Sequence, residues 1–307
     1  MRPQLDGQSI GLFFRATRPA FLSVTALAVL LGHASAIHDG YIINYFSAIL
    51  TLMFALVAHA GANVVNDYYD ALNGCDFAES DRIVPFTGGS QTIQKGLLSQ
   101  KTVGMFGYSL LLSVIPIGLW LATQSGLGLV VIGTLGLLVG WAYSAPPLKL
   151  QSRGLGELAI TTGWLLVVVG SDYVQRGNFS ITPITAGLAY SLLVANILFI
   201  NQFPDVRADA IAHKGTLAVR LGVQNARWGY LMIILLSYSW IWVATNLRLL
   251  PNYSLLAAIP IIPNLLGFYL LMRHAKQPKN LTQAIKITLS CAMAHAMILA
   301  CVLVFFA

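Results

Sequence analysis

Residues 42–76, IINYFSAILTLMFALVAHAGANVVNDYYDALNGCD, join a long apolar run to a cluster of carboxylates. The run from Ile42 to Val65 is long enough to cross a bilayer as an α-helix, which takes about 20 residues. The acidic residues follow it directly, at the point where such a helix would leave the hydrocarbon. This stretch therefore predicts a membrane-spanning helix with polar chemistry at one end.

Eight further apolar runs of similar length are distributed along the 307 residues. They are too long and too uniformly apolar for the strands of a transmembrane barrel, which alternate over about ten residues. We therefore expect an all-α membrane protein with about nine transmembrane helices, in a single domain over residues 1–307. The other eight predicted spans are Ala20–Ala36, Val103–Thr123, Leu127–Tyr143, Leu158–Val174, Ile184–Phe203, Trp228–Leu247, Tyr253–Met272 and Ala284–Phe306.

The overall composition supports this fold class. Hydrophobic residues make up 57% of the chain and charged residues only 9%. A soluble domain carries about 25% charged residues, so an ordinary soluble protein is excluded. A disordered chain is excluded as well, because disorder requires low hydrophobicity and high charge.

The few charged residues gather on one side of the predicted membrane. Of the 18 Lys and Arg residues, 16 fall on the side of the N-terminus and only Arg176 and Arg248 on the other. The positive-inside rule therefore predicts a cytoplasmic N-terminus. We expect the membrane to be the cytoplasmic membrane of a prokaryote. Nine of the 11 acidic residues share the basic side, and seven of them follow the second and sixth spans. We expect a functional site on this face.

Two acidic clusters repeat one pattern. Asn66 and Asp70 stand four residues apart after the second span, and Asn201 and Asp205 do so after the sixth, with Asp209 four residues further on. Residues four apart share a face of a helix, where like charges repel. A helix end that keeps such carboxylates is therefore expected to meet a cation.

The predicted cation is Mg²⁺, because this hard ion is usually held by one or two carboxylates together with substrate phosphates. Basic residues on the same face suit phosphate, with Arg as a bidentate donor and Lys as a point charge. The residues concerned are Arg18, Lys149, Arg153, Lys214 and Arg220. A solvated charged loop is the alternative for either acidic cluster alone, but it explains two clusters of one pattern less well.

A transporter or channel for an anionic solute is the rival class. It would hold charged residues inside its spans, and only Asp172 stands near the outer end of one. Ionisable residues near the middle of the spans are His33, His59 and His295, and we expect each to be a buried, hydrogen-bonded histidine.

The motifs NDYYDALNGCD (66–76) and DVRAD (205–209) resemble those of the UbiA superfamily of intramembrane prenyltransferases. Asp76 stands two residues later than the third acid of the usual family pattern. This departure resembles the 1,4-dihydroxy-2-naphthoate polyprenyltransferase branch. So do the segments SDRIVPFTGGSQTIQKGLLS (80–99), YSAPPLKLQSRGLGE (143–157) and KGTLAVRLG (214–222).

The resemblance implies a helical bundle around a central cavity. It also implies Mg²⁺-dependent transfer of a polyprenyl group from an allylic isoprenoid diphosphate to an aromatic acceptor, with release of diphosphate. The branch implies 1,4-dihydroxy-2-naphthoate as acceptor, in menaquinone-type quinone biosynthesis. 4-Hydroxybenzoate and homogentisate remain alternatives. The expected partners are thus the two substrates and the lipid bilayer, with no nucleic acid.

Individual roles follow from matching positions. The resemblance assigns Mg²⁺ and diphosphate to Asn66, Asp70, Asp205 and Asp209. It matches Arg18 to a family Arg near the start of the first span, and it sets Tyr143 and Lys149 beside the reacting end. From the clusters we add Asp67 to the metal ligands, and Asn201, Arg153 and Lys214 to the diphosphate-binding residues. The Tyr143 ring would steady an allylic cation or else belong to an interfacial aromatic belt. Asp76 or another carboxylate would accept the acceptor's proton.

Overall fold

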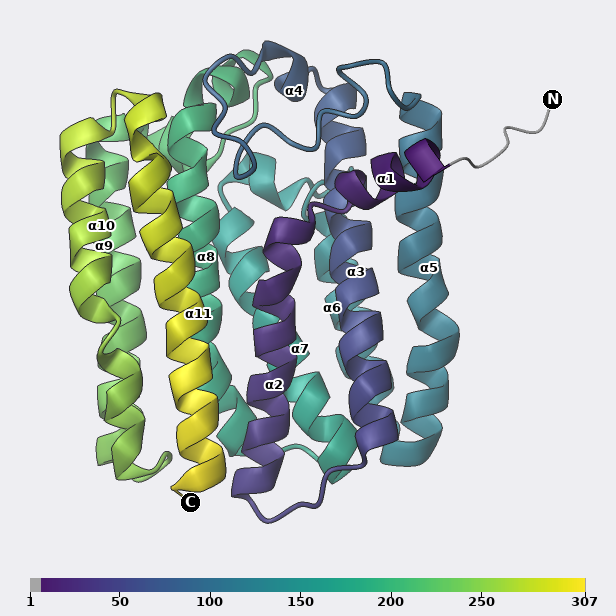
Figure 1. Ribbon diagram of the computed structural model, residues 1–307, viewed down its shortest axis with the longest axis vertical. Coiled ribbons are helices and arrows are strands. Elements are labelled where there is room, and N and C mark those ends of the chain that lie inside the picture. The colour runs from purple at the N-terminus through teal and green to yellow at the C-terminus, as the bar shows by residue number, and fades with distance from the viewer. Residues whose placement is uncertain (1–6, 307) are drawn as a thin grey trace.

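The computed structural model describes residues 7–306, and in that range the chain is a bundle of helices without β-strands (Figure 1). Arg2 and Asp6, which we counted on the basic side, lie outside the described residues. The long helices are α2 (Leu22–His38), α3 (Tyr45–Leu72), α5 (Gln100–Ser125), α6 (Gly128–Ala142), α7 (Gly156–Arg176), α8 (Ile181–Ile211), α9 (Leu217–Asn246), α10 (Ile261–His274) and α11 (Thr282–Phe305). The short ones are α1 (Gly7–Ala16), α4 (Cys75–Ala78), η1 (Pro19–Phe21), η2 (Leu150–Arg153), η3 (Asn252–Ala258) and η4 (Pro278–Leu281).

Each of the nine predicted apolar runs is helical, which confirms the all-α fold class. Within the described chain, eight helices are long and apolar enough to cross a membrane, counting those that continue from a 3₁₀ turn. The ninth run is α6, whose 15 residues make the shorter apolar helix Gly128–Ala142. At 1.5 Å per residue it extends about 22 Å, less than the roughly 30 Å hydrocarbon core. The count of nine spans and the side of the N-terminus stay predictions.

One half of the bundle is solid. Its centre is α8, which packs against α7, α9, α2 and α11. Large side chains of α8 are fully enclosed there, among them Tyr190, Phe199 and Phe203. Apolar residues of α9, α10 and α11 complete the same core. Burial of this kind is worth about 1.5–3 kcal/mol for each large side chain, so this half supplies most of the packing energy.

The other half is formed by α3, α5, α6 and α7, and it is hollow. The helices contact one another in the order α3, α5, α6 and α7, and α3 also touches α7. The side chains between them leave the space described below. The expected central cavity is therefore displaced to one side of the bundle.

The loops at one end carry the acidic motifs. This end holds α4, η2, the loop between α4 and α5 and the loop between α8 and α9 (Figure 1). Helix α1 lies across it, with Ala16 packed among Val64 and Val103. The α1 side chains Ile10 and Phe14 are exposed, as on a helix that lies in a membrane interface.

At the opposite end, Arg176 joins α7 to the segment after α2. Its guanidinium contacts Asp172 at 2.8 Å and Asp39 at 2.6 Å. Asp172, the charged residue that we placed near the outer end of a span, is therefore paired.

Candidate active site

The polar end of the cavity is organised around Lys214. Its Nζ lies 3.0 Å from Asp70 Oδ2 and 3.6 Å from Asp209 Oδ1, so one ammonium joins the two acidic motifs. Burial lowers the pKa of Lys214, but the facing carboxylates outweigh it and raise the pKa well above its ordinary value. Lys214 therefore stays charged and holds α3 and α8 together at this end.

Asp70 is held from several sides. Asn66 Nδ2 donates to its Oδ2 at 3.0 Å, and Gln151 Nε2 donates to its Oδ1 at 3.2 Å. Asn66 Nδ2 also lies 3.0 Å from Ser144 Oγ. The helix end, the segment after α6 and η2 thus fix one carboxylate in place.

Asp67 faces the other wall of the same end. It forms an ion pair with Arg18, and its Oδ2 accepts a hydrogen bond from the Ser90 backbone N–H at 3.0 Å. Burial alone would lower the pKa of Arg18. The carboxylates of Asp67 and Asp76 outweigh this effect, so the pKa of Arg18 is raised above its ordinary value. Arg18 Nε is buried without a partner among the described residues, which leaves a charged donor available at the cavity mouth.

Asp76 lies outside the helices that span the bundle, and its pKa is strongly raised. Burial, reinforced by the nearby Asp70 and Asp67, raises the pKa of Asp76 to about 7. Gln94 Nε2 donates to its Oδ2 at 3.1 Å. A carboxylate with a pKa near neutrality is suited to exchange protons.

The second acidic motif has more buried oxygen atoms without a hydrogen-bond partner than the first. Asp205 Oδ1 is buried without a partner in the described chain. Asn201 Oδ1 is in the same situation. Buried oxygen acceptors usually have partners, so two orphaned ones beside a cavity indicate a missing donor or cation.

The donor set fits a hard divalent ion in part. Among residues 7–306 no three His, Cys, Asp or Glu side chains converge into a ready metal shell. Mg²⁺ needs fewer protein ligands, because it is usually bound by one or two carboxylates plus phosphates and water. The orphaned oxygens of Asp205 and Asn201 supply ligands of the required chemistry.

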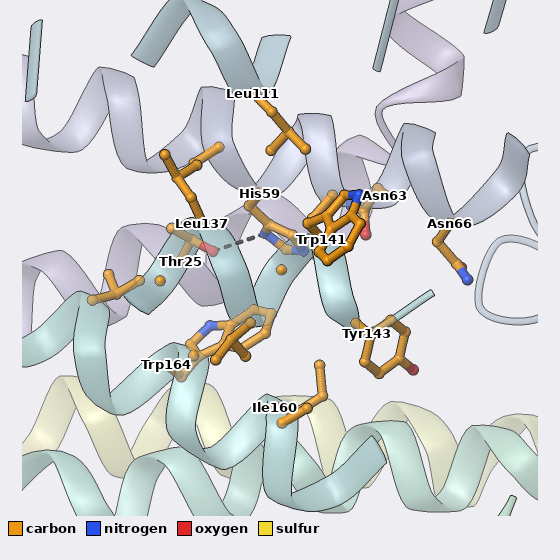
Figure 2. A pocket seen from close by; sticks show the side chains of 18 of the residues that line it. Thr25, His59, Asn63, Asn66, Leu111, Leu137, Trp141, Tyr143, Ile160 and Trp164 are labelled. Atoms are coloured by element: carbon orange, nitrogen blue, oxygen red, sulfur yellow. Dashed lines mark hydrogen bonds between the residues drawn. The ribbon is translucent and has the colours of Figure 1, made fainter. Parts of the chain in front are cut away.

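An apolar cavity of about 800 Å³ continues from this polar end into the bundle. Helices α3, α5, α6 and α7 form most of its wall, and α8 closes the polar end with Asn201, Asp205 and Asp209. No described residue of α9, α10 or α11 reaches it. Tyr143, at the end of α6, projects into the cavity (Figure 2). A pocket of this size and lining suits a largely apolar ligand with one polar end.

Most predicted site residues meet here, and three do not. Lys149, Arg153 and Arg220 are exposed and lie outside the cavity lining. Arg153 donates to the Pro147 carbonyl at 2.8 Å, and Arg220 donates to the Gly215 carbonyl at 2.7 Å. Their predicted diphosphate contacts stay predictions. The residues that do lie at the polar end are Arg18, Asn66, Asp67, Asp70, Asp76, Tyr143, Asn201, Asp205, Asp209 and Lys214.

Several residues at this end were missed from the sequence. Gln151 and Ser144 bind the Asn66–Asp70 pair, and both stand in the segment 143–157 that we had singled out. The Cys75 thiol also donates to Asp209 Oδ1 at 3.1 Å. Burial raises the pKa of Cys75, so it stays a protonated donor.

Together, the fold and the site define an all-helical membrane protein with an acidic and basic polar end above an apolar cavity. The sequence model of the UbiA prenyltransferase family matches residues 21–305. The chain belongs to this family and is a prenyltransferase of the type that we inferred from its motifs.

Named relatives are similar over most of the chain. A UbiA prenyltransferase domain-containing protein 1 of Dictyostelium discoideum is 30% identical over 73% of this chain and 68% of its own length. The 1,4-dihydroxy-2-naphthoate octaprenyltransferase of Escherichia coli is 30% identical over 70% of each chain. The resemblance to the naphthoate branch is thereby confirmed.

A solved structure has the same fold. The UbiA homologue of Archaeoglobus fulgidus, bound to GPP and Mg²⁺, superposes with a TM-score of 0.58 over 94% of this chain and 99% of that one. Its sequence identity is 16%, so the likeness establishes the fold alone.

Proposed function

We propose that this protein transfers a polyprenyl group from an allylic isoprenoid diphosphate to 1,4-dihydroxy-2-naphthoate, with Mg²⁺, and releases diphosphate. The observation that carries the proposal is the junction of the Asp70, Asp209 and Lys214 cluster with an apolar cavity of about 800 Å³. Such a junction fits a substrate with an anionic head and an apolar tail. The name of the Escherichia coli relative supports the acceptor.

In this proposal the carboxylates of Asp67, Asp70, Asp205 and Asp209, with Asn66 and Asn201, hold the ion and the diphosphate. Mg²⁺, when bound, neutralises charge on the departing diphosphate. Arg18 and Lys214 donate to the same oxygens, because both are charged and line the cavity. Donors that are fixed before the reaction stabilise the developing charge without reorganisation.

With the diphosphate held in this way, the remaining steps involve the chain's own groups and the two substrates. The allylic C–O bond breaks and its electron pair leaves with the diphosphate oxygen. The Tyr143 ring faces the resulting cation. The ring carbon that bears the acceptor carboxylate forms the new bond, while Asp76 accepts the proton of the neighbouring hydroxyl, whose oxygen becomes a carbonyl. Loss of the carboxylate from the same carbon as carbon dioxide returns the electron pair to the ring, and the oxygen recovers its proton from Asp76.

We further propose that the protein is one domain over residues 1–307 in the cytoplasmic membrane of a prokaryote, with the polar end toward the cytoplasm. The charge division supports this orientation, since 16 of 18 basic residues fall on the side of the acidic motifs.

The test is turnover by the purified protein with Mg²⁺, geranyl or farnesyl diphosphate and a panel of acceptors. We expect release of diphosphate and a prenylated product with 1,4-dihydroxy-2-naphthoate, and little product with 4-hydroxybenzoate or homogentisate. A protein that prenylates none of these acceptors refutes the proposed function. Preferred use of one of the other acceptors refutes the naphthoate assignment alone.

The metal-binding roles are tested by Asp70→Asn and Asp205→Asn. Each should abolish Mg²⁺-dependent turnover in a protein that still folds and inserts. The matched control is Asp81→Asn, because Asp81 follows the same motif but pairs with exposed Arg207 outside the cavity lining. Activity in both site variants equal to that of the control contradicts the assignment.

A further inference from the structure

The wall of the apolar cavity carries a second polar position, away from the carboxylates. His59 lies on α3 and lines the cavity (Figure 2). Together with Asn63, Asn66 and Asp70 it follows intervals of four, three and four residues, so all four share one face of the helix. From Asn66 to His59 the helix rises about 10 Å. A polar stripe therefore runs from the acidic end into the apolar space.

Two neighbours fix the His59 ring. Its Nδ1 lies 2.8 Å from the hydroxyl of Thr25 on α2. The indole of Trp164 on α7 packs edge to face against it, with ring centroids 5.0 Å apart at 83°. A side chain held by three helices has one orientation, as a binding residue requires.

The other ring nitrogen faces the cavity. No described residue forms a hydrogen bond with His59 Nε2, and Figure 2 shows the ring with its bonded nitrogen toward Thr25 and its second nitrogen on the opposite side. In a neutral imidazole one nitrogen donates and the other accepts, so Nε2 takes the role opposite to that of Nδ1. An isoprenoid tail has no polar atom for it. A polar group in an apolar space is costly without a partner, so this nitrogen is matched to a ligand oxygen.

Aromatic side chains surround the same part of the cavity. Trp141, Tyr143 and Trp164 all line it, and Figure 2 shows them around the space below His59. Aromatic faces and edges bind flat aromatic rings better than they bind a flexible chain. The 10 Å between Asn66 and His59 leaves room for one ring system with its substituents.

We propose that His59 orients the aromatic acceptor, by a hydrogen bond from its Nε2 side to an oxygen substituent that points away from the carboxylates. Trp141 and Trp164 border the ring. This inference rests on the proposed function and names the part of the site that holds its second substrate. His59 is thus a specificity-determining residue. The expected hydrogen bond is present at Nδ1, and the proposed binding role concerns the Nε2 side.

The first experiment compares wild type with His59→Phe, which keeps a ring of similar size and removes both nitrogens. We expect the KM for the acceptor to rise about tenfold, equivalent to about 1.4 kcal/mol, with the KM for the diphosphate changed less than twofold. His33→Phe is the matched control, since His33 bonds the Ser171 carbonyl and does not line the cavity. A merely structural His59 would lower turnover without this separation of the two KM values.

The second readout uses competitive inhibition by naphthols and naphthoates that lack one oxygen substituent each. The analogue without the contacted oxygen should inhibit wild type and His59→Phe equally, while the intact acceptor distinguishes them. Thr25→Val provides a second variant if His59→Phe fails to fold. It frees the imidazole from its anchor and should raise the acceptor KM by a smaller factor.

The outcomes separate the two proposals. Absence of any prenylated product with wild type refutes the proposed function. Normal wild-type turnover with an unchanged acceptor KM in a folded His59 or Thr25 variant overturns the acceptor subsite alone. A rise confined to the diphosphate KM also overturns it, because His59 would then face the donor.

Discussion

Two glycines on the wall of the cavity lead to the prediction that replacing them with alanine raises the stability of the protein. Gly133 and Gly136 of α6 line the cavity, and a Cβ added at either position would meet no heavy atom within 4 Å. Glycine inside a helix costs about 0.5–1 kcal/mol relative to alanine. Packing does not require glycine here. Gly133→Ala and Gly136→Ala should each stabilise the protein by about 0.5–1 kcal/mol, and the double variant by about 1–2 kcal/mol.

Because Gly133 and Gly136 have no side chains, this part of the cavity is open, and under the proposed function it takes the substrate tail. Gly136→Phe fills part of that space from α6, and no neighbouring atom opposes the new Cβ. We therefore expect the variant to fold with near wild-type stability. Its turnover should fall more with a long-chain diphosphate than with geranyl diphosphate.

The assay pairs thermal unfolding in detergent with turnover on donors of increasing length. The control is Gly32→Ala, where the added Cβ would lie 2.3 Å from the Val168 carbonyl oxygen between α2 and α7. A clash with backbone has no cheap relief, so Gly32→Ala should lose stability by at least about 1–3 kcal/mol.

Two results would refute the reasoning. One is a Gly136→Ala variant as unstable as Gly32→Ala, which would mean that α6 is packed where the cavity is described. The other is a stable Gly136→Phe variant that uses short and long donors equally well, which would mean that the substrate tail does not lie against α6.

Three further predictions concern charged groups. Lys214→Met leaves Asp70 and Asp209 without their counter-ion, so the melting temperature should drop by the equivalent of about 3–5 kcal/mol and recover partly with Mg²⁺; a drop indifferent to Mg²⁺ would contradict this. Arg18→Lys removes a forked donor worth about 1.5–3 kcal/mol and should cut turnover tenfold or more, unlike the same change at exposed Arg15. Arg176→Ala should destabilise the far end by about 3–5 kcal/mol and spare both KM values, which steady-state kinetics would check.

The sequence predicted the elements well because each helix carries its own signal. A run such as Ile42–Val65 has only one stable arrangement in hydrocarbon, since every backbone group must be bonded within the helix. The repeated Asn66–Asp70 and Asn201–Asp205 pairs predicted which helix ends meet. Helix α1 escaped notice because its ten residues are too few to span.

What the sequence could not supply is the direction of loop side chains. Lys149 has a left-handed backbone (φ 43°), and the turn that follows directs Arg153 to the Pro147 carbonyl rather than to the cavity. Gln151, between them, turns inward to Asp70. Lys149, Gln151 and Arg153 thus point in different directions because of the local backbone geometry. Composition and spacing do not predict that geometry. His59 was placed correctly in its span, but only the packing of α3 against its neighbours shows that it borders a cavity.

The unequal division of the bundle also governs the order in which the protein comes apart. Regions with little buried apolar surface open at lower free energy than regions with much. Helices α5 and α6 should therefore exchange their amide hydrogens sooner than α8, in which most side chains are buried. A bound substrate adds its own apolar surface to the weaker half alone and stabilises it by mass action. The bound substrates thus act as a removable part of the hydrophobic core. The two halves of the bundle should differ least in local stability while substrate is bound.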